Sequence, residues 1–201
     1  YARGMGAICP IEVIPNGVDV GKYQVDSIKY QAAEFKKKHG ISEGDKVVIT
    51  TSRLVPKNGI DTLIEAMKFL PDNTRLLILG DGPLGKELRL RTTNYGLQTR
   101  ISFLGHTPPD EIPHYLQLVD VFCRPSRSEG MGSSFIEAMA AGVPVVATRV
   151  GGIPDFLKDR ETGLFCEVDN PKSVAEKINL LLDDSVLRQR ITQNAHAMGL
   201  H

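Results

Sequence analysis

Ser126 to Pro144, with the sequence SRSEGMGSSFIEAMAAGVP, leads from an apolar strand through a polar, glycine-containing loop into an apolar helix. The strand ahead of it is expected at Val121–Cys123. The helix is expected over Ser134–Ala141, because Gly142 followed by a proline is a common helix end. A strand, a loop and a helix in this order form the repeating unit of a parallel α/β sheet, so this stretch indicates the fold class.

The same alternation continues on both sides of this stretch. The predicted strands are short and apolar throughout, which favours a parallel sheet covered by helices on both faces. Further strands are expected at Val47–Thr51, Arg75–Leu79, Ile101–Leu104, Val145–Thr148 and Gly163–Phe165, and further helices at 24–39, 59–70, Leu84–Tyr95, 111–119, 172–183 and 185–197. Ahead of this domain, expected over 21–201, residues 1–20 are interpreted as a linker with a short strand at Ile11–Ile14.

Charge and apolar runs exclude two classes of function. The formal net charge is zero, which argues against a nucleic-acid binder that works through bulk charge. The basic run Lys36–Lys38 is expected on the solvated face of a helix. No apolar run approaches the roughly 18 residues of a membrane span, and no signal peptide is predicted.

Cysteine and histidine spacing indicates a reducing compartment and no metal. The three cysteines, Cys9, Cys123 and Cys166, are too few and too far apart for a disulfide framework. Cys123 and Cys166 lie in apolar runs, where we expect small core residues. The histidines lack the spacing of a zinc site, so no metal is expected, and the predicted location is the cytoplasm.

Polar and glycine-rich segments follow the predicted strands. The carboxyl ends of parallel strands meet at one edge of the sheet, where α/β folds bind ligands. We therefore expect these segments to converge there: Ser52–Asn58, Gly80–Gly82, Gly105–Pro108, Ser126–Ser134 and Gly151–Gly152.

The loop and helix start around Glu129 and Glu137 suit a ligand with both phosphate and hydroxyl groups. A helix that opens after a strand presents unpaired N–H groups and a positive dipole end to an anion. Two carboxylates beside it can accept hydrogen bonds from hydroxyls, which suggests a sugar phosphate or a nucleotide sugar. The alternative is a capping box, in which Ser134 caps the helix and Glu137 only reaches back to the cap.

Arg53 and Lys57 follow the first regular strand and suit phosphate oxygens, one as a planar fork and the other as a point charge. The alternative is a helix entry with two surface cations. A second motif, Gly80 to Gly85, matches the GxGxxG pattern of dinucleotide sites. That match follows the second regular strand, whereas a dinucleotide motif follows the first. The next strand also lacks the acidic residue that would hold a ribose. A plain turn with Pro83 at a helix start explains it better.

Taken together, the motifs resemble a known family. Glu129 and Glu137 are separated by seven residues, as in the Glu-x7-Glu signature of retaining GT-B glycosyltransferases of family 4, the glycosyl transferases group 1 type. Other stretches agree with this resemblance: IPNGVD at 14–19, TSRLVPKNG at 51–59, LILGDGP at 77–83, FLG at 103–105, PSRSEG at 125–130, EAMAAGVPVVAT at 137–148 and GGIPD at 151–155.

The resemblance implies a Rossmann-like parallel sheet sandwiched by helices, as in the C-terminal, donor-binding half of a GT-B fold. It also implies a hexosyltransferase that uses a nucleoside-diphosphate sugar without metal or cofactor. The acceptor half would precede Tyr1, so the chain is expected to be a fragment that is inactive alone. The full-length enzyme could work in the cytoplasm or on the cytoplasmic face of a membrane.

The resemblance further implies which groups meet the donor phosphates. Arg53 and Lys57 would hold the diphosphate, although many relatives place the lysine one residue later, where this chain has Asn58. Backbone N–H groups would contact the sugar and the phosphate from three positions: Gly132, Ser133 and Ser134.

For the rest of the donor, the resemblance assigns Glu137 to the ribose hydroxyls and the loop at His106 and Thr107 to the base. Glu129 would bind hydroxyls of the transferred sugar next to the reacting carbon, which makes it the candidate catalytic residue. Two other functions stay open at this point. One is a non-catalytic nucleotide-binding or interaction module of the same fold, and the other is an NAD-dependent oxidoreductase domain.

Overall fold

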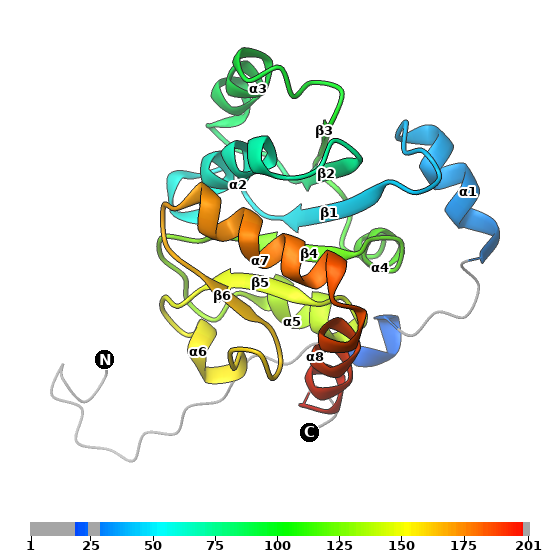
Figure 1. Cartoon of the computed structure of the whole chain (residues 1–201), viewed down its shortest axis with the longest axis vertical. Helices are drawn as coiled ribbons and strands as arrows, with labels where there is room; N and C mark the ends of the chain where they lie inside the picture. The colour runs from blue at the N-terminus through cyan, green and yellow to red at the C-terminus, as the bar shows by residue number, and fades with distance from the viewer. Residues whose placement is uncertain (1–18, 24–28, 199–201) are drawn as a thin grey trace, which may run out of the picture.

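Six parallel strands form one twisted sheet in the computed structural model, which describes residues 19–23 and 29–198 (Figure 1). The strand order is β3-β2-β1-β4-β5-β6, the order of a doubly wound Rossmann-like sheet. The expected α/β fold is therefore confirmed. The strands are β1 Lys46–Thr51, β2 Thr74–Leu79, β3 Ile101–Gly105, β4 Val121–Arg124, β5 Val145–Thr148 and β6 Leu164–Cys166. The strand expected at Ile11–Ile14, and the linker as far as residue 18, lie outside the described residues.

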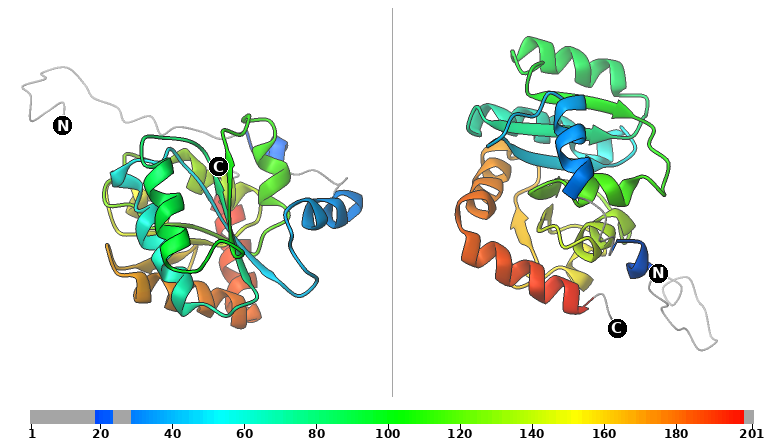
Figure 2. Two further views of the ribbon diagram at one scale, coloured as in Figure 1. Left: turned by 90° about the horizontal axis from the view of Figure 1, so that it is seen from above. Right: turned by 90° about the vertical axis from the view of Figure 1, so that its right-hand side faces the viewer.

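Helices cover both faces of the sheet (Figures 1 and 2). One face packs against α2, α3, α7 and the start of α8, and the other against α4, α5, α6 and the end of α8. The helices are α1 Lys29–Lys38, α2 Ile60–Ala66, α3 Gly85–Asn94, α4 Ile112–Leu116, α5 Ser133–Ala140, α6 Ile153–Phe156, α7 Pro171–Asp183 and α8 Ser185–Met198, with short 3-10 turns at η1 Val20–Tyr23, η2 Pro56–Asn58 and η3 Met67–Phe69.

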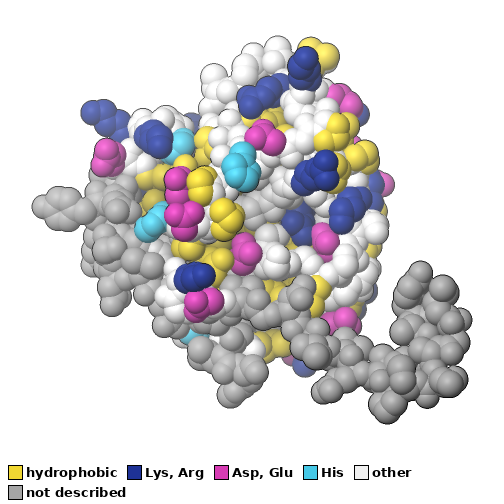
Figure 3. Space-filling model, turned by 180° about the vertical axis from the view of Figure 1, so that it is seen from behind, with side chains coloured by type: hydrophobic (Ala, Val, Ile, Leu, Met, Phe, Trp, Pro, Cys, Tyr) yellow, Lys and Arg dark blue, Asp and Glu magenta, His cyan; other side chains and the backbone are white. Residues whose placement is uncertain are grey.

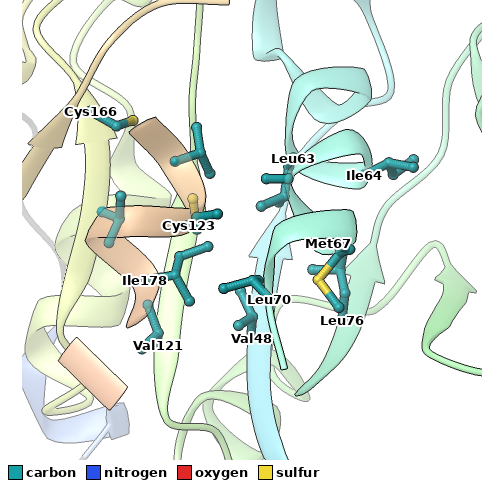
Figure 4. Packing of buried hydrophobic residues seen from close by; sticks show 14 of the residues in the cluster. Val48, Leu63, Ile64, Met67, Leu70, Leu76, Val121, Cys123, Cys166 and Ile178 are labelled. Carbon is teal, nitrogen blue, oxygen red and sulfur yellow. The ribbon is translucent and has the colours of Figure 1, made fainter. Parts of the chain in front are cut away.

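The two faces explain why the strands are apolar throughout. Successive strand side chains point to opposite faces, so Val48 packs in one cluster while its neighbour Ile49 packs in the other. Figure 4 shows the first of these clusters, in which Cys123 of β4 and Ile178 of α7 lie among buried side chains. Cys123 and Cys166 are free and buried, and burial raises the pKa of both thiols, that of Cys166 to about 12. They are core residues as expected, whereas Cys9 lies outside the described residues.

Two helices differ from the sequence-based expectation. The helix predicted over 111–119 ends at Leu116. The Asp120 N–H donates to the Val47 carbonyl oxygen, and the Asp120 carboxylate accepts from the Val47 N–H, both at 2.8 Å. These bonds draw the chain early into β4. No helix was among those expected between Val145–Thr148 and Gly163–Phe165, but Ile153–Phe156 forms α6, since a proline such as Pro154 is tolerated in the first turn of a helix.

Basic and acidic side chains are interspersed on the face in Figure 3 rather than gathered by sign. Within 19–23 and 29–198, none of the helices combines the length and the hydropathy that a bilayer crossing requires.

Candidate functional site

A cavity of about 1180 Å³ opens where β1 and β4 end side by side. This is the position in the sheet at which the strand order reverses, and doubly wound folds bind their ligands there. Both strands point to the same edge of the sheet in Figure 1. The volume slightly exceeds the usual range for small-molecule sites, so the cavity suits an extended ligand.

All of the site residues expected from the sequence line this one cavity. They come from the loops after β1, β3 and β4 and from the first two turns of α5, so the predicted convergence of the strand ends is confirmed in the geometry. The residues are Arg53, Lys57, His106, Thr107, Glu129, Gly132, Ser133, Ser134 and Glu137. Their individual roles stay predictions. Arg124 and Asn58 line the same cavity and were not among the expected residues.

The loop after β1 is held in place by its own side chains and by the loop after β2. The Asn58 amide is buried and donates to the Arg53 carbonyl oxygen at 2.7 Å. Gly80 is needed because a Cβ there would lie 2.0 Å from the Ser52 carbonyl oxygen, and at Gly82 it would lie 2.4 Å from that of Leu54. These two glycines of the GxGxxG match therefore have a backbone-packing role that requires no dinucleotide.

The loop after β3 is fixed by Asp81, whose carboxylate accepts the His106 N–H at 2.8 Å. His106 itself is exposed. The loop carrying His106 and Thr107 is thereby held at the cavity mouth, with the imidazole available to a ligand.

The loop after β4 centres on a buried ion pair. Arg124 Nη2 donates to Glu129 Oε2 at 2.5 Å, and only 7% of the Arg124 side chain and 10% of the Glu129 side chain is exposed. The other carboxylate oxygen, Oε1, accepts the Gly130 N–H at 3.0 Å and lies 3.8 Å from Lys57 Nζ. Both oxygens of Glu129 are therefore engaged by protein groups.

The start of α5 corrects the capping-box alternative. The helix begins at Ser133, its cap is Gly132 in the left-handed conformation (φ 69°), and no side chain caps it. Ser134 lies inside the first turn, where its Oγ accepts from Arg124 Nη1 at 2.7 Å. The capping interpretation of Ser134 and Glu137 is thus wrong. The Phe135 N–H donates to the Gly132 carbonyl oxygen at 3.0 Å, whereas the N–H groups of Ser133 and Ser134 precede the first hydrogen bond of the helix.

Gly151 and Gly152 support this loop from behind. The Gly152 N–H donates to the Gly130 carbonyl oxygen at 2.8 Å. A Cβ on Gly151 would lie 1.7 Å from the Glu129 carbonyl oxygen. Only glycine, which has no Cβ, therefore allows the backbone to pass this close to Glu129.

Arg127 joins the loop after β4 to the loop after β1. Its guanidinium donates to both carboxylate oxygens of Asp61 at 3.0 and 2.8 Å and to Asp169 at 2.6 Å, and its backbone N–H donates to the Lys57 carbonyl oxygen at 2.7 Å. Burial alone would raise the pKa of Asp61, but the hydrogen bonds and charge of Arg127 bring that pKa below its ordinary value. The network keeps Lys57 next to Glu129.

Glu137 sits half-buried on α5 and faces the cavity. Burial raises its pKa, and the nearby charge of Arg124 opposes that rise. Burial also raises the pKa of Tyr23 to about 12, with Glu137 adding to the shift. A partly dehydrated carboxylate of this kind gains from a hydrogen-bond donor supplied by a ligand.

Over the part of the chain that the structure describes, His, Cys, Asp and Glu side chains form no group of three or more that could hold a metal ion. The sequence-based expectation of a metal-free site stays a prediction. The cations that face the cavity are side chains: Arg53, Lys57 and Arg124.

Comparisons with known proteins agree on one family. A family model described as "Glycosyl transferases group 1" matches residues 31–198. The GDP-mannose-dependent alpha-(1-6)-phosphatidylinositol monomannoside mannosyltransferase of Mycobacterium tuberculosis is 35% identical over 194 residues, which cover 92% of this chain and 50% of that protein. The chain spans about half the length of the curated relatives it matches.

Two solved structures are similar to the whole sheet. Anabaena HepE in complex with UDP and glucose has a TM-score of 0.86 and 29% identity, and the match covers 94% of this chain and 52% of that one. The C-terminal domain of the glycosyl transferase group 1 protein LpcC from Francisella tularensis has a TM-score of 0.78 and 28% identity. That match covers 90% of this chain and 96% of the solved domain.

Proposed function

Because the chain belongs to the glycosyl transferases group 1 family, we propose that its cavity binds the donor of a retaining, family 4 glycosyltransferase. The enzyme would transfer a hexose from a nucleoside-diphosphate sugar to an acceptor hydroxyl. One observation carries this proposal: cationic side chains, free helix amides and two carboxylates line a single cavity at the carboxyl edge of the sheet. That set provides donors for phosphates and acceptors for sugar hydroxyls.

In this proposal the diphosphate lies between the β1 loop and the start of α5. Arg53 offers a planar pair of donors, Lys57 adds a second positive charge, and the amides of Gly132, Ser133 and Ser134 meet the remaining oxygens. Negative charge grows on the diphosphate as the bond to the sugar breaks. These groups are in place before the reaction, so they stabilise that charge without reorganisation and without a metal.

The two carboxylates take different parts of the donor. Glu137, half-buried on α5, accepts hydrogen bonds from the ribose hydroxyls, and the loop at His106 and Thr107 contacts the base. Glu129 faces the transferred sugar. Its oxygens already accept from Arg124 and from the Gly130 N–H, which supports a positioning role over attack on the sugar carbon.

The acceptor hydroxyl attacks on the side from which the diphosphate leaves, so the configuration of the sugar carbon is retained. Acceptor contacts would come from the half of the enzyme that this chain does not match in its longer relatives. We therefore propose that the chain alone binds donor but transfers little or no sugar, and that the enzyme works in the cytoplasm. We propose no particular base for the donor, because the name of one relative includes GDP-mannose and one similar structure is a complex with UDP and glucose.

Calorimetric titration of the chain with UDP, GDP and ADP tests this proposal. We expect one of the three to bind, and Arg53→Ala to weaken that binding by about 1.5–3 kcal/mol, roughly ten- to a hundredfold. No heat from any of them at millimolar concentration would contradict donor binding. Nucleotide binding without transferase activity of the full-length protein would instead support a non-catalytic module.

A further inference from the structure

We propose that Arg124 is a positioning residue, which holds Glu129 and Ser134 in the arrangement that receives the transferred sugar. The inference rests on the proposed function, because it gives Glu129 its role next to the sugar. Arg124 occupies the last position of β4, where the sequence shows only an apolar run that ends in one arginine.

Three hydrogen bonds tie the guanidinium to three segments of the site. Nη2 donates to Glu129 in the β4–α5 loop at 2.5 Å, and Nη1 donates to Ser134 Oγ on α5 at 2.7 Å. Nη1 also donates to the Thr51 carbonyl oxygen at the end of β1, at 3.2 Å. One rigid planar group thus sets the distance between the loop, the helix start and the strand end.

Packing fixes the guanidinium itself. Its central carbon, Cζ, lies 4.3 Å from the centre of the Phe135 ring, a cation–π contact with the same helix that carries Ser134. Gly132 leaves the space for it, because a Cβ there would lie 3.0 Å from Nη2 and 2.6 Å from the Phe135 ring. The loop conformation before α5 and the position of Arg124 therefore depend on each other.

The other cation near Glu129 cannot do the same. Lys57 Nζ is 3.8 Å from Glu129 Oε1, and 55% of the Lys57 side chain is exposed. A flexible, solvated ammonium at this distance restrains a carboxylate weakly. Arg124, buried and bonded at fixed angles, is the group that determines where the Glu129 carboxylate points.

Stability alone does not account for this arginine. Burying a charged pair is costly, and apolar side chains of similar volume are often at least as stable. The Arg124 Nε is buried and has no hydrogen-bond partner among the described residues, so the group is not even fully satisfied. The positioning of Glu129 and Ser134 explains why a buried, incompletely bonded arginine lines this cavity.

The test compares nucleotides with nucleotide sugars. UDP and UDP-glucose, and GDP and GDP-mannose, are titrated into the wild-type chain, Arg124→Met, Arg124→Lys and the control Arg149→Met. Arg149 also stacks on a phenylalanine, Phe165, at 4.2 Å, but it does not line the cavity. We expect Arg124→Met to lower the affinity for the preferred nucleotide sugar about tenfold more than the affinity for its nucleotide.

Arg124→Lys should recover part of that difference, and Arg149→Met should change neither affinity. Glu129→Gln keeps the arginine and tests only whether Glu129 meets the sugar, whereas Arg124→Lys covers the case in which Arg124→Met does not fold. An equal loss for nucleotide and nucleotide sugar, or no loss, would overturn the inference.

A measurement without ligand separates this inference from the proposed function. The Gly130 N–H is bonded to Glu129, so its proton chemical shift and exchange rate report on the carboxylate. In Arg124→Met or Arg124→Lys we expect this amide to shift and exchange faster, and in Arg149→Met to stay unchanged. If no nucleotide binds the wild type, the proposed function fails; an unaltered Gly130 amide in both Arg124 variants rejects the positioning role by itself.

Discussion

Replacing Gly132 by alanine should damage the site through two separable effects. Gly132 has φ 69°, and an alanine in this left-handed region costs about 1–2 kcal/mol. Its Cβ would also lie 2.6 Å from the Phe135 ring and 3.0 Å from Arg124 Nη2, and such overpacking costs about 1–3 kcal/mol. We therefore expect Gly132→Ala to lower the free energy of unfolding by about 2–5 kcal/mol in total.

Gly142 provides a matched control at the other end of α5. Its φ of 74° is nearly the same, but a Cβ there would meet only Thr192, at an ordinary 3.7 Å. Urea unfolding of Gly142→Ala should therefore show only the backbone cost, about 1–2 kcal/mol. Gly132→Ala should also weaken nucleotide binding, while Gly142→Ala should not. Equal losses of stability in the two variants would refute the claim that the start of α5 is crowded by Arg124 and Phe135.

Three further changes test the surroundings of the site. Arg127→Ala should lower the free energy of unfolding, measured with urea at pH 7, by about 1.5–3 kcal/mol. Because the folded pKa of Asp61 lies below the ordinary 3.8, this loss should shrink as the pH falls below that value. A loss that does not change with pH would contradict the pairing of Arg127 with Asp61. Glu137→Gln should stabilise the ligand-free chain above the raised pKa of Glu137 while weakening nucleotide binding. That gain should vanish as the pH falls to the ordinary 4.5, and a destabilised variant at pH 7 would count against a burial cost. Asp81→Ala removes the acceptor of the His106 N–H. It should lower the free energy of unfolding in urea by about 1 kcal/mol and the nucleotide affinity a few-fold. Unchanged values would show that other contacts hold the loop after β3.

Most of the fold could be predicted because its signals are local. Apolar runs such as Arg75–Leu79 and one-face helix patterns such as that of 59–70 depend on burial alone, and all six strands were expected within a residue or so of their bounds. One error, at the end of α4, came from a contact between distant segments. The early end of α4 depends on Asp120 and Val47, which lie 73 residues apart, and no local pattern shows that pairing.

The same distinction between local signals and distant contacts applies to the residues of the site. Residues at strand ends, such as Arg53 and Glu129, could be placed at one edge because the parallel sheet brings those ends together. Arg124 was missed because it completes an apolar strand, and only its position as the lone charge of that run pointed to it. The capping box was wrong for a similar reason: Ser134 is bonded by an arginine from another element, which sequence spacing does not reveal.

The location of the donor phosphates can be measured directly by titrating the ¹⁵N-labelled chain with UDP or GDP, whichever binds, and following the backbone amide signals. A diphosphate at the proposed place should shift the amides of Gly132, Ser133 and Ser134 most strongly, together with the Arg53 loop, and Arg53→Ala should reduce all of these shifts at equal nucleotide concentration. Shifts confined to another part of the chain, or a saturable interaction that leaves the start of α5 unperturbed, would contradict the account.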